Sequence, residues 1–333
     1  FGKIKNKRSM VYIGNLCHLV YETITQEKSG IFLASDDEAI STSRLIELIA
    51  KNLDKKIDEF KKSLIKKANE ELENTPVQLL LPLVFEDRRP IPNAFIRSAL
   101  FGMVKKGARQ EMKNCEIFSF EQYKIKYSGE ALDQTDLMTW DTIVYMAKIM
   151  QSNNVLTTSK YRILKELGLT QTGTNAKTVF NRLKRLQGGQ IEMEINVNSK
   201  NKARGWYVGS LLDDVLVNED NGEVQIRFNK RLLTIFGQPS KENPQILDGD
   251  YSIVNHDERR IIGESQLARW IYHLYSSSDN IYPLTMDFLK QLSRSNLSII
   301  EFRRHIKISM ADLSSKLGWK YKIKDDKLTV ITK

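Results

Sequence analysis

The sequence has few of the residues on which secreted, membrane-spanning and metal-binding proteins depend. Its only cysteines are Cys17 and Cys115, too few for a disulfide framework and not at zinc spacing. No run approaches the about 18 apolar residues of a membrane-spanning helix. The basic start is not followed by the apolar core of a signal peptide, so we expect a cytoplasmic protein without contact to a membrane.

Catalytic constellations are also missing from the sequence. The histidines His18, His256, His273 and His305 are scattered, so neither a paired-His metal motif nor the His-x-His cluster of a rolling-circle nickase is present. Residues 168–174 have the glycine spacing of a phosphate loop without its lysine, which indicates a turn. The sequence therefore predicts a protein that is not an enzyme and uses no metal or cofactor.

Positive charge is what the sequence does have, and it is concentrated. The 333 residues carry a formal net charge of +10. Residues 159–210 hold ten Lys or Arg against three acidic residues, and residues 288–333 hold eleven against four, which leaves the remainder of the chain acidic. Two separate basic segments predict two docking surfaces for one polyanion.

The N-terminal quarter is dominated by one amphipathic pattern. From Ser41 to Glu73 apolar residues recur every three or four positions, which predicts a long helix that either packs on its own domain or binds a partner helix. Thr75-Pro76 ends this helix, and residues 86–92 predict an extended linker because a proline disfavours helix in the residue before it.

Downstream, one order of elements is predicted twice. The first copy is expected to contain helices at Asn93–Val104, Thr139–Met150, Lys160–Leu167 and Thr174–Leu186, strands at Glu116–Phe120, Tyr123–Tyr127, Gln190–Val197, Trp206–Leu212 and Glu223–Phe228, and a short helix to Phe236. The second is expected to contain helices at Glu264–Tyr275, Thr285–Leu292 and Ser298–Leu317 and a hairpin of Tyr321–Ile323 with Leu328–Ile331. Helices followed by a two-stranded wing are typical of a winged helix. The predicted fold is α+β, with an N-terminal helical region (1–75), a linker (76–91) and tandem winged-helix domains (92–240 and 241–333).

The third helix of the first copy has the composition of a DNA-reading helix. Its apolar stripe is expected to be Ala176, Val179, Phe180, Leu183 and Leu186. The residues expected to point away from that stripe, toward DNA, are Asn175, Lys177, Thr178, Asn181, Arg182, Lys184 and Arg185, with Lys200, Lys202 and Arg204 in the loop of the following hairpin, the predicted wing. A basic helix face that merely contacts water has a similar composition, and this alternative stays open.

The third helix of the second copy is a second candidate. Ser298 and Glu301 have capping-box spacing, and Phe302, Ile306, Met310, Leu313 and Leu317 form its expected buried face. The expected DNA contacts are Ser295, Asn296, Arg303, Arg304 and Lys307, together with Lys324 and Lys327 of the hairpin.

Several segments resemble one protein family. Residues 92–101, Pro-Asn-Ala-Phe-Ile-Arg-Ser-Ala-Leu-Phe, resemble the PN-x-x-x-RSALF helix of TrfA-type plasmid replication initiators. Residues 123–129, residues 136–145, the Ala-Arg-Trp-Ile-Tyr segment at 268–272 and the Tyr-Pro-Leu segment at 282–284 agree with that family in the same order. The resemblance extends over residues 78–333.

This resemblance implies a function. Such initiators bind direct repeats called iterons in duplex DNA as monomers, are inactive as dimers, help to open the origin and recruit the host initiator and replicative helicase. The family often carries a stretch that binds the sliding clamp, and Gln78, Leu79 and Leu81 occupy its place, although Pro82 replaces the expected aromatic residue. Two alternatives remain: the Gln78 stretch is a buried strand, and the protein is a winged-helix transcriptional repressor without a role in initiation.

Overall fold

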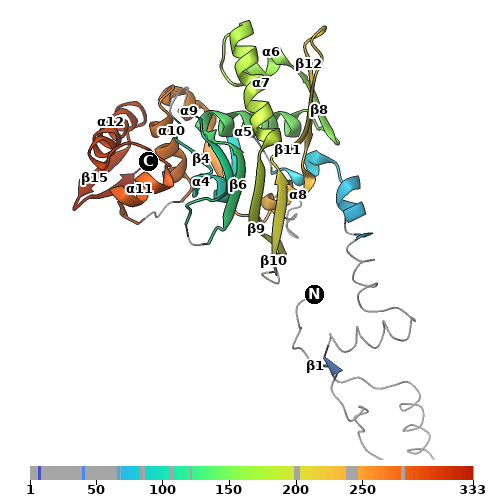
Figure 1. Ribbon diagram of the computed structural model, residues 1–333, viewed down its shortest axis with the longest axis horizontal. Coiled ribbons are helices and arrows are strands. Elements are labelled where there is room, and N and C mark those ends of the chain that lie inside the picture. The colour runs from blue at the N-terminus through green and yellow to red at the C-terminus, as the bar shows by residue number, and fades with distance from the viewer. Residues whose placement is uncertain are drawn as a thin grey trace, which may run out of the picture. The chain divides into compact units, whose positions relative to one another are not determined.

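The chain consists of two structural units. The computed structural model describes residues 7–8, 40–41, 66–67, 69–82, 84, 87–104, 109–120, 122–198, 203–237, 247–278 and 282–332. The units are Phe1–Leu72 and Glu73–Lys333, and the elements of the larger unit are labelled in Figure 1. Every helix in the described ranges is too short or too polar to cross a bilayer.

The smaller unit contains a two-stranded antiparallel ribbon, formed by β1 (Lys7–Arg8) and β2 (Ile40–Ser41). Residues 66–67 and 69–72 are helical, and Lys66 and Glu70 lie one turn apart with 3.7 Å between Nζ and Oε1. Most of the helix predicted over Ser41–Glu73 lies outside the described residues.

The larger unit begins with a 3-10 turn, η1 (Val77–Leu80), and a strand that pairs far along the chain. That strand, β3 (Arg88–Pro92), is antiparallel to β13 (Tyr251–Asn255). The sequence predicts an extended linker here, and the chain is indeed extended, but it is hydrogen-bonded into a ribbon. The short helix α4 (Asn93–Ile96) follows directly.

The remaining elements of the larger unit fall into two halves. The first half contains β4 (Phe101–Gly102), β5 (Glu111–Glu116), β6 (Ile125–Glu130), β7 (Leu132–Asp133), α5 (Gln134–Ile149), β8 (Val155–Ser159), α6 (Lys160–Glu166), α7 (Gly173–Gly188), β9 (Gln190–Asn198), β10 (Ala203–Ser210), β11 (Leu212–Val217), β12 (Glu223–Phe228), α8 (Lys230–Leu233) and η2 (Thr234–Phe236). The second half contains β13, α9 (His256–Ile262), α10 (Gln266–Ser276), β14 (Leu284–Thr285), α11 (Met286–Leu292), α12 (Ile299–Leu317), β15 (Lys320–Lys324) and β16 (Lys327–Thr332).

The same order of elements occurs in both halves: helix, strand, two helices, two strands. In the first half it is α5, β8, α6, α7, β11 and β12, and in the second it is α10, β14, α11, α12, β15 and β16. The sheets agree as well, since the last strand lies in the centre of each, in the orders β11-β12-β8 and β14-β16-β15.

This equivalence changes which hairpin of the first half corresponds to β15–β16. The hairpin β9–β10, which the sequence predicts as the wing, is inserted between α7 and β11 and belongs to a separate sheet of order β10-β9-β6-β5. The counterpart of β15–β16 is instead β11–β12, whose turn carries Glu219 and Asp220. The alternating pattern of the two hairpins is alike in sequence, and only strand pairing separates them.

Some predicted elements are wrong because distant partners determine the local structure. The helix predicted over Asn93–Val104 ends at Ile96, since Ser98 bridges Ser119 and β4 pairs with β7. The strand predicted over Glu116–Phe120 is displaced. The observed strand, β5, ends at Glu116, where the predicted strand begins. By contrast α6, α7, α10, α11 and α12 agree with prediction to within about two residues.

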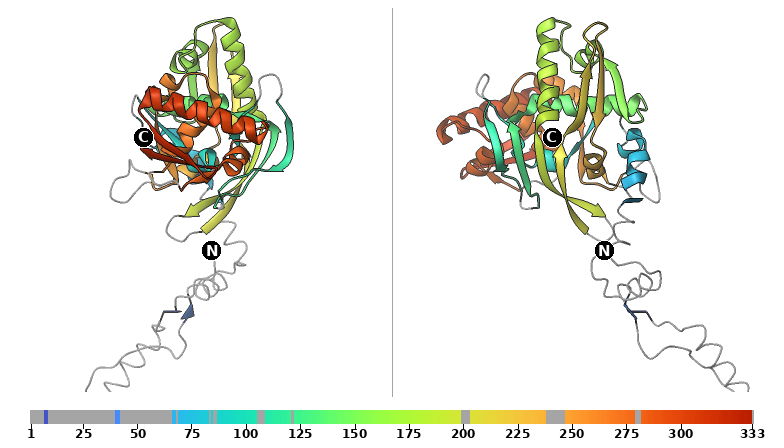
Figure 2. Two further views of the ribbon diagram at one scale, coloured as in Figure 1. Left: turned by 90° about the vertical axis from the view of Figure 1, so that its left-hand side faces the viewer. Right: turned by 45° about the vertical axis from the view of Figure 1, so that its right-hand side comes forward.

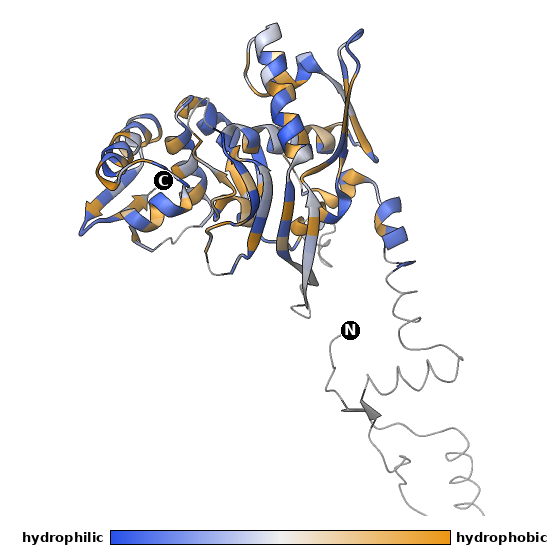
Figure 3. Cartoon of the chain, in the orientation of Figure 1, coloured by the Kyte–Doolittle hydropathy of each residue, from blue (hydrophilic) through white to orange (hydrophobic). Residues whose placement is uncertain are grey.

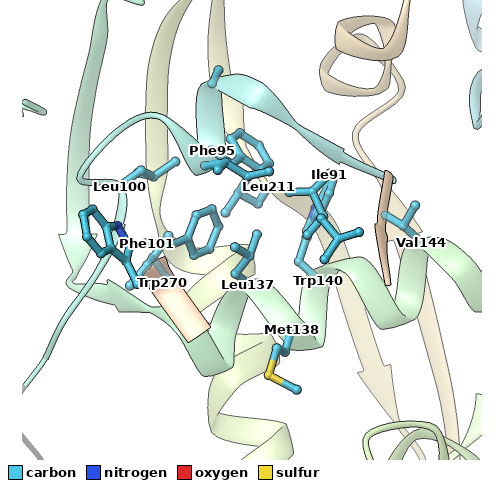
Figure 4. Packing of buried hydrophobic residues seen from close by; sticks show 14 of the residues in the cluster. Ile91, Phe95, Leu100, Phe101, Leu137, Met138, Trp140, Val144, Leu211 and Trp270 are labelled. Atoms are coloured by element: carbon cyan, nitrogen blue, oxygen red, sulfur yellow. The ribbon is translucent and has the colours of Figure 1, made fainter. Parts of the chain in front are cut away.

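Aromatic side chains form the centre of the first half. Trp140 of α5 lies edge-on to Phe95 at 5.1 Å between ring centroids and stacks on Phe236 at 6.1 Å. Phe95 also contacts Phe101 at 5.4 Å, and all four rings are buried. Figure 4 shows Phe95, Phe101 and Trp140 between α4 and α5, with Trp270 of α10 close by. Helix α5, which carries Trp140 of this core, also packs against α7.

Candidate nucleic-acid interface

The start of α12 is fixed by a capping box. The Ser298 hydroxyl accepts from the backbone N–H of Glu301 at 3.2 Å, and the Glu301 carboxylate accepts from the backbone N–H of Ser298 at 3.2 Å. This confirms the predicted cap, and it lowers the pKa of Glu301 because Ser298 donates to the carboxylate. Phe302, Ile306, Met310 and Leu313 are fully buried as predicted, while Leu317 is only partly buried.

The opposite face of α12 is exposed and basic. Arg304 and Lys307 are exposed, and they share this face with two exposed isoleucines, Ile300 and Ile308. α12 packs on α10 and α11 and against the C-terminal hairpin, which leaves this face turned outward (Figure 2). A helix face of this kind has the cations that hold phosphates and the length to enter a major groove.

Arg303 is tied to the hairpin rather than free. Its Nε and Nη2 donate to the two carboxylate oxygens of Asp326 at 2.6 and 2.7 Å. Asp325 and Asp326 have φ values of 48° and 58°, as a two-residue hairpin turn requires. Lys324 and Lys327 flank this turn and are exposed, and the ion pair joins the turn to α12.

Ser295 and Asn296 have different surroundings. The sequence predicts that both project toward DNA, but Ser295 is buried and the prediction for it is wrong. Arg294, at φ 52°, turns the chain so that the Ser295 N–H donates to the Lys290 carbonyl at 3.1 Å. Asn296 is exposed, as predicted.

Of the predicted contacts on α7, Lys177, Thr178, Asn181 and Lys184 are exposed. Figure 3 shows hydrophilic and hydrophobic residues alternating along this helix. Val179, Leu183 and Leu186 form the buried stripe, whereas Phe180 and Ala176 are only partly buried. The Lys184 ammonium lies 4.5 Å from the centre of the Phe180 ring. Asn175 is half-buried and donates to the carbonyl and hydroxyl of Thr170 at 2.8 and 2.9 Å, so it stabilises the turn before α7.

Arg182 and Arg185 do not point away from the buried stripe, which corrects their predicted position. Arg185 donates to the buried Asp136 carboxylate through Nε at 3.1 Å and Nη2 at 2.8 Å. Arg182 is half-buried beside the same carboxylates, and burial lowers the pKa of its guanidinium. Both arginines flank the apolar stripe, and the long side chain of Arg185 reaches the acidic N-terminus of α5.

The carboxylates at that N-terminus are themselves paired. Asp133 is the N-cap of α5, and Arg109 donates to it at 2.5 Å and to Asp136 at 3.0 Å. Burial alone would raise the pKa of Asp133, but the charge of Arg109 and hydrogen bonds from Thr135 lower it below its usual value. Of the cations in residues 159–210, Arg185 is therefore paired within the fold.

Three predicted contacts lie in or beside the β9–β10 loop. Lys200 and Lys202 lie outside the described residues, and of Arg204 only the backbone, in β10, is described. The hairpin that is equivalent to β15–β16 has an acidic turn, in which Glu219 accepts from Lys160 at 2.5 Å. The two equivalent hairpins therefore differ in charge. The turn of β15–β16 is flanked by exposed lysines, whereas the turn of β11–β12 is acidic.

The Gln78 stretch does not form the buried strand of the alternative interpretation. It forms η1, with Leu79 57% exposed and Leu81 buried. The Lys148 ammonium donates to the carbonyls of Gln78 and Leu81 at 2.8 and 2.7 Å. Gln78 and Leu79 are accessible at the surface, but Leu81 is held in the core.

The most specific sequence motif has a structural position that sequence reasoning missed. Asn93 donates to the Asp250 carboxylate and accepts from the Ser252 hydroxyl, both at 2.6 Å. Arg97 donates to the Ser277 hydroxyl at 3.0 Å. The Pro-Asn-Ala-Phe-Ile-Arg segment thus joins the two halves, and no local signal in the sequence reveals its partners.

A metal site is not among these arrangements. Within the described ranges, no group of three His, Cys, Asp or Glu side chains is placed to hold a metal ion.

Residues 47–212 match the model of the TrfA protein family. The chain is similar to this family over just under half of its length. The match includes residues 92–101 and so confirms the resemblance to TrfA-type plasmid replication initiators, while α12 and its hairpin lie beyond the matched residues.

Solved structures that are similar to parts of the chain were also found. Domains 2 and 3 of RctB are 12% identical, with 72% of this chain and 96% of that chain covered and a TM-score of 0.46. The Pi initiator protein in complex with iteron DNA is 11% identical, with 59% and 91% covered and a TM-score of 0.39. The WH1 domain of MSBI1.176, a replication protein isolated from a multiple sclerosis patient, is 15% identical, with 30% and 77% covered and a TM-score of 0.23. No curated protein matches the chain.

Proposed function

We propose that this chain is a plasmid replication initiator whose larger unit binds iteron repeats in duplex DNA through two winged helices. The observation that carries the proposal is the exposed basic face of α12, with Arg304 and Lys307, beside a hairpin whose turn is flanked by Lys324 and Lys327. The match of residues 47–212 to the TrfA family model supports the role in plasmid replication.

In this proposal the two halves contribute differently. α12 enters a major groove, Arg304 and Lys307 contact phosphates and base edges, and the hairpin lysines contact the adjacent backbone. α7 presents fewer free cations, Lys177 and Lys184, because Arg182 is half-buried and Arg185 is bonded to Asp136. The first half therefore contributes mainly phosphate contacts that fix the register on the repeat.

The resemblance to the TrfA family supports our proposal for the other steps of initiation. The bound chain promotes opening of the origin and recruits the host initiator and replicative helicase, acts without catalysis or a cofactor, works in the cytoplasm, and changes between dimer and monomer. The exposed Leu79 and the accessible Gln78 provide the contact to the sliding clamp.

Binding is tested first with the full chain and duplexes that carry the direct repeats flanking its coding region. We expect Arg304→Ala and Lys307→Ala each to weaken binding and to reduce the slope of log affinity against log salt by about 1, since each removes one phosphate contact. The measurement is fluorescence anisotropy between about 50 and 200 mM salt.

Lys316→Ala is the matched control. Lys316 is on the same helix and carries the same charge, but it donates inward to the Ile262 carbonyl at 2.9 Å. This variant should keep the salt slope of the parent protein. If Arg304→Ala and Lys307→Ala also keep it, the proposed interface is wrong.

A second experiment separates initiation from repression. A plasmid that carries only the repeats, an adjacent AT-rich segment and the coding region should replicate in a host that lacks any other initiator for it. Repeat binding without replication would favour the repressor.

A further inference from the structure

The first turns of α12 present one large apolar side chain to solvent. Ile300 is the second residue of the helix and is 75% exposed. Isoleucine is a poor helix former because its β-branched side chain is restricted in a helix, and this one contributes little to packing. Single exposed apolar residues are common on protein surfaces, so the exposure of Ile300 does not by itself indicate a binding site. The side chains around Ile300 decide whether it does.

The polar side chains around Ile300 are mostly engaged within the protein. Glu301 accepts from both the backbone N–H and the hydroxyl of Ser298, and Arg303 is held by Asp326. Arg304, one helical turn further along, is exposed on the same face as Ile300. The leading end of this face therefore consists of an isoleucine followed by an arginine.

The surrounding charge identifies what covers this face. Arg304, Lys307, Lys324 and Lys327 are exposed around it, and they would repel a second copy of the same basic surface while attracting a polyanion. In the major groove of DNA the one apolar group on the base edges is the C5-methyl of thymine. Residues near the start of a recognition helix are the ones that reach base edges.

We propose that Ile300 reads a thymine by contact with its C5-methyl group, so that the preferred repeat has thymine at the position that faces the first turn of α12. This inference rests on the proposed function and adds the base that the site selects. Arg304 holds the phosphate or base next to it and thereby fixes the depth at which Ile300 enters the groove.

The size of the effect follows from burial of one methyl group. Removing the methyl from the contacted thymine is expected to weaken binding about four-fold, because one buried methyl or methylene group contributes about that factor. The same removal at a thymine that faces no apolar side chain is expected to have no effect on affinity.

The test begins with a pool of random duplex DNA, from which the full chain selects its preferred site. Each thymine of the selected duplex is then replaced in turn by deoxyuridine, which lacks only the methyl group. Binding of each duplex is measured for the parent chain and for Ile300→Ala. We expect one position at which the parent loses about four-fold and Ile300→Ala loses nothing.

Ile253→Ala is the control, because Ile253 is also a substantially exposed isoleucine, at 45%, but lies on β13. It should respond to deoxyuridine as the parent chain does. Circular dichroism of both variants confirms that they are folded.

Three outcomes would overturn the inference. Every deoxyuridine substitution is neutral for the parent chain, or the same substitution weakens the parent and Ile300→Ala equally, or Ile300→Ala dissociates dimers in sedimentation equilibrium while base selection is unchanged. In each of these the duplex is still bound. If the pool yields no enriched site at all, the proposed function itself fails, so the two failures are distinguishable.

Discussion

Arg259 and Asp141 form an ion pair in which neither side chain has exposed surface. The same guanidinium lies 3.0 Å from Nδ1 of His256 and 3.5 Å from Nε2 of His273, both of which are buried. Burial, together with the charge of Arg259, lowers the pKa of His256 to about 3 and that of His273 well below its usual value. Both imidazoles are therefore neutral in the folded protein.

These two histidines make stability depend on pH. In the unfolded chain a histidine takes up a proton as the pH falls below about 6.5, whereas in the folded chain His256 does not until about 3. The unfolded state is thus favoured by acid, and His256 alone should cost about 2 kcal/mol of unfolding free energy at pH 5 relative to pH 7. Urea unfolding at pH 7, 6 and 5 measures this loss.

A His256→Asn variant, measured over the same pH range, should show a shallower loss because one of the two buried imidazoles is gone. A free energy of unfolding that does not change between pH 7 and 5 in the parent protein would contradict the argument.

Among the elements, those whose ends are set by nearby residues could be predicted from the sequence. α12 is the clearest case, since Ser298 and Glu301 define its start and Gly318, at φ 73°, defines its end. The exposed positions of Arg304, Lys307, Lys324 and Lys327 followed from that assignment.

Other elements and site residues could not be predicted because their partners are remote in sequence. A helical pattern continues past Ile96, but the pairing of Phe101 with Leu132 ends the helix. Arg185 reads as an outward cation until Asp136, on another helix, is placed beside it. The left-handed backbone of Arg294, which buries Ser295, has no sequence signal of its own, since the residue is not glycine.

The capping box of α12 gives a prediction at the element scale. Ser298→Ala removes the acceptor for the Glu301 N–H at a helix start and should lower the unfolding free energy by about 1 kcal/mol. Because the first turn then frays, DNA binding should weaken as well. Thermal unfolding and anisotropy measure the two effects.

Ser298→Asn is the comparison, since asparagine is also a good N-cap and should restore most of both properties. Equal losses of stability and DNA binding for Ser298→Ala and Ser298→Asn would show that helix capping by residue 298 is not the cause of these losses.

At the scale of the whole larger unit, polar contacts join the two halves. Arg294, from the loop before α12, donates to the Leu132 carbonyl at 2.5 Å and lies against Gly102 of β4. A Cβ at Gly102 would lie 2.7 Å from the Cβ of Arg294 and 2.9 Å from the Ser293 carbonyl oxygen. This glycine is needed for the close approach of the two halves.

Gly102→Ala should therefore destabilise the larger unit by about 1–3 kcal/mol, because backbone must move to admit the methyl group. Urea unfolding measures the loss. Gly188→Ala, where the added Cβ has no neighbour within 4 Å among the described residues, should be neutral or slightly stabilising. Similar losses at both glycines would contradict the predicted crowding at the joint.

The ribbon of β3 and β13 also has a consequence for synthesis of the chain. Asn93 and Asp250, which end this ribbon, are 157 positions apart, so β3 leaves the ribosome long before its partner strand exists. During that interval Ile91, buried in the finished fold, lacks the strand that covers it. The first half of the larger unit cannot complete its structure on the ribosome until Tyr251–Asn255 has emerged, and a nascent chain stalled before this point should remain dependent on chaperones.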